Sequence, residues 1–146
     1  MKIGILTSGG DAPGLNAVIR AAVLKGTRVH GHEFVGFVGG YKGLCEATMM
    51  PLTRHEVKGI SKEGGTILGT SRTNPFDFGG TERVREVLDE HKIDAIIAIG
   101  GEGSLAAAAT DISIYRARGD GDQRSASAGS EVCRVRARKV RDIASC

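Results

Sequence analysis

Residues 1–23, MKIGILTSGGDAPGLNAVIRAAV, decide the fold of this 146-residue chain. The stretch opens with the apolar residues Ile3, Ile5 and Leu6, a short run typical of a buried parallel strand, and the run breaks at Gly9-Gly10. A helix is predicted to follow at once, because Pro13 suits a first helical turn. Apolar residues then recur at the spacing of one helix face: Leu15, Val18, Ile19, Ala22 and Val23. Backbone N–H groups and the positive end of the helix dipole at this turn offer a place for a phosphate.

The same pattern of strand, glycine turn and helix returns near residue 100. Residues 93–99, IDAIIAI, form a continuous apolar run that ends at Gly100-Gly101, as expected of a central parallel strand. The alanines at 106–109 are strong helix formers and predict a helix after this turn.

Weaker signals predict the elements between these two units. Residues 33–38 indicate a strand, 41–45 a loop, and 81–91 a helix with Thr81 as its N-cap. Thr53 and Glu56 have the spacing of a capping box, which predicts a short helix running toward Ile60. The apolar run at 64–72 is flanked by glycines and leads into a loop that carries Arg72.

This alternation of strands and helices predicts an α/β fold with an open, mainly parallel sheet and flanking helices. Ligands of such sheets bind outside the carboxyl ends of the strands. Both glycine turns are expected there.

Charge divides the chain into two parts. Residues 1–110 carry 12 basic and 12 acidic groups, whereas residues 111–146 carry 8 and 5 and therefore hold the whole net charge of +3. This shift predicts a folded part over 1–110 and a basic, disordered tail over 111–146. The rival interpretation is a nucleic-acid-binding extension, but Tyr115 is the only aromatic residue of the tail that could stack on a base, so no nucleic-acid partner is expected.

No segment is apolar for long enough to span a membrane, and the start of the sequence lacks the layout of a signal peptide. A cytoplasmic protein without a membrane partner is therefore expected. Three widely separated cysteines and the isolated pair His30 and His32 do not suggest a metal site.

The glycine turns restrict the chemistry that the chain can perform. Gly9 and Gly14 have the spacing of a phosphate-binding Walker loop, but the lysine that such a loop requires is absent. The turn at Gly101 formally fits a dinucleotide fingerprint without a matching second half. A narrower interpretation remains, in which the backbone approaches a polyphosphate, Glu102 holds a divalent cation and Arg72 stabilises charge on a transferred phosphoryl group. The alternative for Glu102 is an acidic residue at the start of a helix that interacts with the helix dipole. The alternative for Arg72 is a solvated arginine in a loop.

Three motifs, in order and at these separations, resemble the amino-terminal part of ATP-dependent 6-phosphofructokinase of the bacterial type. They are IGILTSGGDAPGLNAVIR at 3–20, GGTILGTSR at 64–72 and IGGEGSL at 99–105. The resemblance covers about residues 1–110 and implies an incomplete large domain of that enzyme. It also implies ATP-dependent phosphorylation of fructose 6-phosphate in glycolysis, with Mg²⁺, in a homotetramer under allosteric control.

The resemblance also implies a set of site residues. ATP-contacting positions of the family match Gly10, Arg72, Thr73, Gly101, Glu102, Gly103 and Ser104, and the Mg²⁺ ligand matches Glu102. Arg72 is the candidate catalytic residue. Gly103 favours ATP, since relatives that use pyrophosphate place Asp there, where a carboxylate would repel an ATP phosphate. Arg20 and Arg54 match an effector site for nucleotide diphosphates, and Leu24 stands where another basic residue is expected.

The resemblance stops before the catalytic base. The family continues with a TIDND-type motif, and neither this motif nor the later sugar-phosphate-binding residues occur in 111–146. These 146 residues alone are therefore expected to be inactive, because the sugar hydroxyl is not activated. A non-catalytic nucleotide-binding remnant is the alternative function, and the tail is interpreted as an out-of-frame translation.

Overall fold

The computed structural model of the chain describes residues 1–73, 79–101 and 132–136. The elements in chain order are β1 (Lys2–Ser8), α1 (Leu15–His30), β2 (Glu33–Phe37), α2 (Tyr41–Cys45), β3 (Met49–Pro51), the 3₁₀ helix η1 (Ile60–Lys62), α3 (Gly80–Glu90), β4 (Ala95–Gly100) and β5 (Val132–Arg136). None of the helices in these ranges is long and apolar enough to cross a membrane.

The strands form one open sheet in the order β3-β2-β1-β4-β5. The three inner strands are parallel: β1 pairs with β2 on one side and with β4 on the other. Both outer strands, β3 and β5, run antiparallel to their neighbours. The predicted open and mostly parallel sheet is confirmed, while its antiparallel edges were not predicted.

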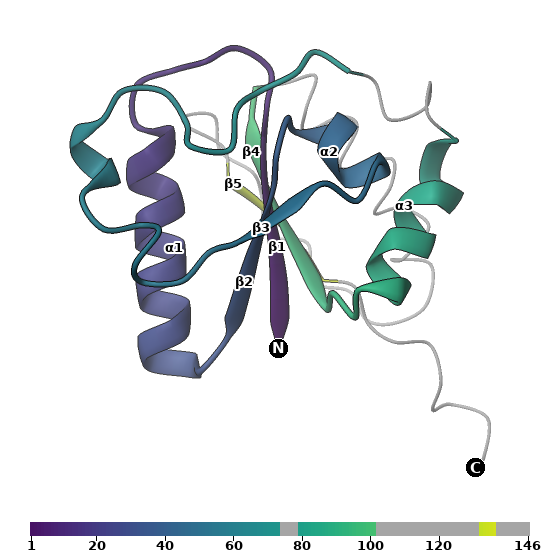
Figure 1. The fold of residues 1–146 in the computed structure, drawn as a ribbon, viewed down its shortest axis with the longest axis horizontal. Coiled ribbons are helices and arrows are strands. Elements are labelled where there is room, and N and C mark those ends of the chain that lie inside the picture. Colours follow the sequence, from purple (N-terminus) through teal and green to yellow (C-terminus); the bar gives the residue numbers. More distant parts are fainter. Residues whose placement is uncertain (74–78, 102–131, 137–146) are drawn as a thin grey trace.

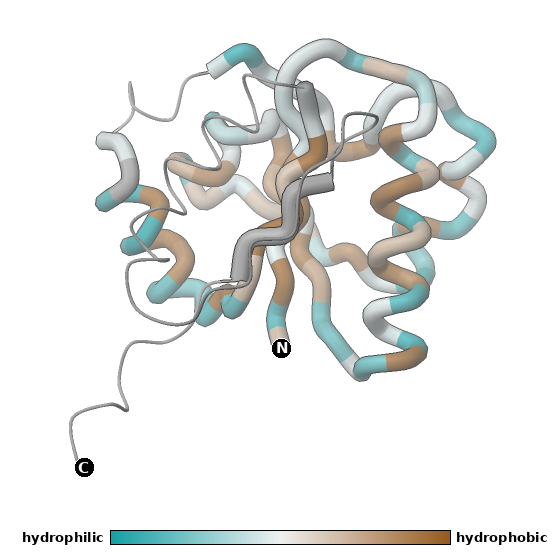
Figure 2. The backbone as a smooth tube through the Cα atoms, turned by 180° about the vertical axis from the view of Figure 1, so that it is seen from behind, coloured by the Kyte–Doolittle hydropathy of each residue, from teal (hydrophilic) through white to brown (hydrophobic). Residues whose placement is uncertain are grey.

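Helices cover both faces of the sheet, with α1 on one face and α2 and α3 on the other (Figure 1). Successive residues of a strand point to opposite faces, so β1 contributes to two separate cores. Ile5 packs with Ile19 and Val23 of α1, whereas Leu6 packs with Leu44 of α2 and with apolar residues of α3. Figure 2 shows hydrophobic residues along the inner strands and on the sides of the helices that face them.

Three predictions for the middle of the chain were wrong. Residues 41–45 form α2 rather than a loop, because Tyr41, Leu44 and Cys45 are all buried on one side of this short helix. Glycine is a poor helix former, but a Cβ at Gly43 would overlap the Val38 carbonyl, so only glycine fits at this position of α2.

The capping box forms its contacts without the predicted helix. The Glu56 carboxylate accepts the Thr53 N–H at 2.9 Å, yet the chain makes a turn and then only the three-residue η1. Gly59 separates this turn from η1. It has a left-handed conformation with φ of 87°, which interrupts any helix. The third error concerns α3: it begins at Gly80 after Gly79, so Thr81 is not its N-cap.

The tail was expected to be disordered, but residues 132–136 form β5 alongside β4. The antiparallel pairing supplies a neighbour for the apolar strand β4, which the sequence pattern of the tail did not suggest. The rest of the tail and the helix predicted at 106–109 lie outside the described residues.

Candidate functional site

Both glycine turns lie at the carboxyl edge of the parallel strands. Ser8, the last residue of β1, pairs with Gly100, the last residue of β4. The turn residues Gly9 and Gly101 follow directly on neighbouring strands, at the upper edge of the sheet in Figure 1. This register confirms the prediction that the two turns share one edge of the sheet.

The turn residues Gly10 and Gly101 leave open space beside the backbone. Both are exposed, and a Cβ added to either would have no heavy atom within 4 Å. The described atoms therefore leave room for at least a methyl-sized group beside the main chain at both turns.

The amino-terminal end of α1 is only partly available to an anion. Gly14 is its N-cap, and the first turn carries no side-chain cap and no acidic residue, which favours an anion. However, the Asn16 N–H already donates to the Gly65 carbonyl at 3.3 Å. The Asn16 N–H is therefore not available to a phosphate at this turn.

A segment at 63–73 lies next to the two glycine turns at this edge of the sheet. It runs from the α1 side across the carboxyl ends of the strands toward the side of α2 (Figure 1). Asn16 is 2% exposed and holds the segment with its side chain: Nδ2 donates to the Glu63 carbonyl at 3.3 Å, and Oδ1 accepts the Ile67 N–H at 2.8 Å. A buried amide with both ends bonded stabilises the segment over the helix.

The far end of the segment is anchored to β1. The buried Thr7 hydroxyl donates to the Gly69 carbonyl at 2.7 Å and lies 3.1 Å from the Thr66 hydroxyl oxygen. The Ser71 carbonyl accepts the Gly9 N–H and the Ser8 hydroxyl, each at 3.3 Å. The chain therefore reaches Arg72 beside the first glycine turn.

The turn after β2 is packed against Thr7 and Ser71. Gly40 has φ of 65°, and a Cβ there would lie 2.6 Å from the Thr7 carbonyl oxygen. This close approach brings the Gly39-Gly40 turn to Ser71, whose hydroxyl donates to the Gly39 carbonyl at 2.7 Å. Backbone from three places in the sequence thus converges on one edge.

The structure brings four of the seven predicted nucleotide contacts to this edge: Gly10, Arg72, Thr73 and Gly101. The Arg72 side chain is exposed and makes no ion pair within the described residues. Glu102, Gly103 and Ser104 lie outside the described residues, although Glu102 directly follows the exposed Gly101. Within the described ranges no three His, Cys, Asp or Glu side chains gather in a group that could hold a metal ion.

The two predicted effector residues lie on the α1 side of the sheet. Arg20 is half-buried on α1, and its Nε is buried without a hydrogen-bond partner among the described residues. Arg54 is exposed in the turn that precedes Val57, and Val57 packs in the same core cluster as Ile19 and Val23 of α1. The turn of Arg54 is therefore attached to the helix that carries Arg20.

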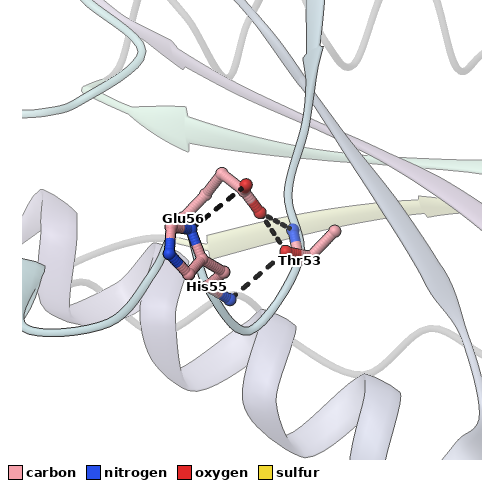
Figure 3. Close-up of polar contacts among 3 residues, drawn as sticks. All are labelled: Thr53, His55 and Glu56. Atoms are coloured by element: carbon pink, nitrogen blue, oxygen red, sulfur yellow. Dashed lines mark hydrogen bonds and ion pairs between the residues drawn. The ribbon is translucent and has the colours of Figure 1, made fainter.

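Local hydrogen bonds hold the turn of Arg54 in shape (Figure 3). The Glu56 carboxylate accepts the Thr53 hydroxyl and the Thr53 N–H, and the Thr53 hydroxyl oxygen accepts the His55 N–H at 3.2 Å. The Thr53 hydroxyl is the largest cause that lowers the pKa of Glu56 below its ordinary value of 4.5.

Sequence reasoning missed the residues that position the candidate site. Asn16, Thr7 and Ser71 all make tertiary hydrogen bonds at this edge. One signal was available for Asn16, because it is a polar residue next to the apolar face of the predicted helix. Thr7 and Ser71 carry no comparable signal, since each donates its hydroxyl to a main-chain carbonyl far away in the sequence.

Comparison with known proteins gives consistent matches. A family model described as Phosphofructokinase matches residues 2–116. The pyrophosphate–fructose 6-phosphate 1-phosphotransferase of Amycolatopsis methanolica is 53% identical over 109 residues. The ATP-dependent 6-phosphofructokinase 3 of Streptomyces coelicolor is also 53% identical over 109 residues. Each of these alignments covers 74% of this chain and 32% of the relative, so the chain spans about a third of their length.

Solved structures agree with the sequence matches. The crystal structure of Pichia pastoris phosphofructokinase in the T-state has a TM-score of 0.72 and is 36% identical, covering 78% of this chain and 12% of that chain. A pyrophosphate-dependent phosphofructokinase from Marinobacter aquaeolei has a TM-score of 0.67 at 19% identity, a likeness of fold alone.

Proposed function

This chain belongs to the phosphofructokinase family, and on that premise we propose that its carboxyl edge binds the phosphates of MgATP. The proposed whole activity is ATP-dependent phosphorylation of fructose 6-phosphate to fructose 1,6-bisphosphate in glycolysis. The observation that carries the proposal is the pairing of Ser8 with Gly100, which puts both glycine turns side by side at one edge.

The proposed phosphate contacts are main-chain groups at Gly10 and Gly101 together with the Arg72 guanidinium. The open space at both glycines and the exposed, unpaired position of Arg72 within the described chain support these roles. Preorganised N–H groups and an arginine stabilise phosphate charge without rearrangement at the moment of reaction. Thr73, Gly103 and Ser104 are proposed to complete the nucleotide contacts. Glu102 is proposed to hold Mg²⁺, which would neutralise phosphate charge when bound.

Pyrophosphate is the second candidate phosphoryl donor. It is supported by the pyrophosphate-dependent relative from Amycolatopsis methanolica, which is as similar to this chain as the ATP-dependent relative from Streptomyces coelicolor. We favour ATP because this chain has Gly103 at the position where, by the family resemblance, relatives that use pyrophosphate have Asp.

We propose that these 146 residues alone bind the nucleotide without transferring its phosphoryl group. Their sequence contains no TIDND-type motif to supply the general base. Residues 1–110 are proposed as the nucleotide-binding part, and 111–146 as a basic tail in which β5 is the described ordered element. We also propose a cytoplasmic location, no nucleic-acid partner, family-type oligomers, and a separate effector contact at Arg20 and Arg54.

Isothermal titration calorimetry of the purified chain tests the proposal, with MgATP and magnesium pyrophosphate as separate ligands. We expect heat from MgATP at a stoichiometry near one per chain and little from pyrophosphate. The opposite preference would support the second donor, and no heat from either ligand in material with a cooperative thermal melt would contradict the proposed site. A coupled assay for ADP release with fructose 6-phosphate should show no sugar-dependent turnover.

A further inference from the structure

We propose that Ser71 is a positioning residue that sets the place of Arg72 at the nucleotide edge. This inference rests on the proposed function, because it assigns a role through a contact between Arg72 and phosphate. Ser71 itself has no contact with the phosphates in this proposal.

Ser71 joins two glycine turns that come from different strands. Its carbonyl accepts the Gly9 N–H and the Ser8 hydroxyl at the end of β1, each at 3.3 Å. Its hydroxyl donates to the Gly39 carbonyl, beyond the end of β2, at 2.7 Å. The next residue in the chain is Arg72, so its main chain leaves directly from this junction.

Arg72 lacks an anchor of its own within the described residues. Its side chain is exposed and forms no ion pair there. The direction in which the guanidinium leaves the protein therefore depends on the backbone before it. Contacts that hold a charged group in its productive position contribute to binding even when they lie away from the ligand.

The Ser71 hydroxyl is the hydrogen-bonding group of Ser71 that a substitution can remove. Ser71→Ala deletes the hydrogen bond to the Gly39 carbonyl and leaves both bonds to the Ser71 carbonyl in place. Gly40 lies beside it, and a Cβ added there would be in ordinary van der Waals contact with the Ser71 hydroxyl oxygen at 3.5 Å. Loss of the hydroxyl therefore loosens the link between the β2 turn and the residue before Arg72.

A double-mutant cycle on MgATP affinity tests this inference. The variants are Ser71→Ala, Arg72→Ala and the double substitution, all measured by calorimetry. Thr70→Ala is the matched control, because it removes a hydroxyl from the adjacent residue that makes no side-chain hydrogen bond with the described residues. Far-UV circular dichroism and thermal melts confirm that each variant folds. Should Ser71→Ala fail to fold, Ser71→Cys keeps nearly the same size with a weaker donor and takes its place.

We expect Ser71→Ala to weaken MgATP binding about threefold to tenfold, as the loss of one hydrogen bond predicts, while Thr70→Ala has no such effect. In the Arg72→Ala background, Ser71→Ala should cause no further loss, because its effect passes through Arg72. Additive losses, or unchanged affinity in folded Ser71→Ala, would overturn the positioning role while leaving the nucleotide site intact. Absence of MgATP binding by the unsubstituted chain would overturn the proposed function and this inference together.

Discussion

The Asn16 Oδ1 atom accepts the N–H of Ile67 at 2.8 Å, and through this contact α1 holds the segment 63–73 that carries Arg72. Asn16 also donates from Nδ2 to the Glu63 carbonyl, so both ends of one buried amide are bonded to the same segment. The amino-terminal end of α1 lies at this edge of the sheet, and α1 therefore also positions the segment 63–73 there.

Asn16→Ala should destabilise the chain by about 1–3 kcal/mol, because it leaves the Ile67 N–H and the Glu63 carbonyl without their partner. Chemical denaturation monitored by circular dichroism measures the change. Lys25→Ala on the exposed part of α1 is the control and should stay within about 0.5 kcal/mol. Equal stabilities of the two variants would show that the amide does not hold the segment.

Gly43→Ala should destabilise the chain by about 1–3 kcal/mol, although alanine is the better helix former. The added methyl group would overlap the Val38 carbonyl, which is main chain and cannot rotate away. Gly64→Ala is the matched control, since its Cβ would have no heavy atom within 4 Å. Thermal melts of both variants make the comparison, and a higher melting temperature for Gly43→Ala would contradict the close approach.

Gly10→Ala should leave the unfolding free energy nearly unchanged, because the space beside Gly10 is open. The same methyl group occupies the proposed phosphate position, so MgATP binding should fall about tenfold to a hundredfold, as expected for losing a hydrogen bond to a charged group. Calorimetric titration measures the affinity. Gly64→Ala again serves as the control, and equal affinities would place the phosphates away from this turn.

Glu56 should make folding stability depend on pH in the acid range. Its pKa is lowered in the folded state, chiefly by the Thr53 hydroxyl, so its contribution is present above the ordinary pKa of 4.5 and is lost as the pH falls below that value. Glu56→Gln should flatten this part of the curve of unfolding free energy against pH. Glu63→Gln is the control, because the Glu63 side chain is exposed and makes no hydrogen bond or ion pair with the described residues. A slope preserved in Glu56→Gln would exclude this carboxylate as its source.

The repeated pattern of strand, glycine turn and helix was sufficient to predict the parallel centre of the sheet. β1 and β4 are short apolar runs, and α1 has apolar residues along one face. Few arrangements other than a parallel sheet covered by helices would bury all of these side chains. Local rules failed where tertiary packing overrode propensity, as at α2, which contains a glycine yet buries Tyr41, Leu44 and Cys45. They failed in the opposite sense at Thr53, where the capping contacts form but no α-helix follows.

The sequence by itself determined that the chain has glycine turns after apolar strands, and that Arg72 follows a glycine-flanked run in the order typical of one family. Only the tertiary structure decided how these pieces meet: Ser8 beside Gly100, and Ser71 between the turns of β1 and β2. The physical reason is that each of these contacts has a main-chain group as at least one partner, and the two partners lie far apart in the sequence. Every residue carries such groups, so no residue pattern marks which of them will pair.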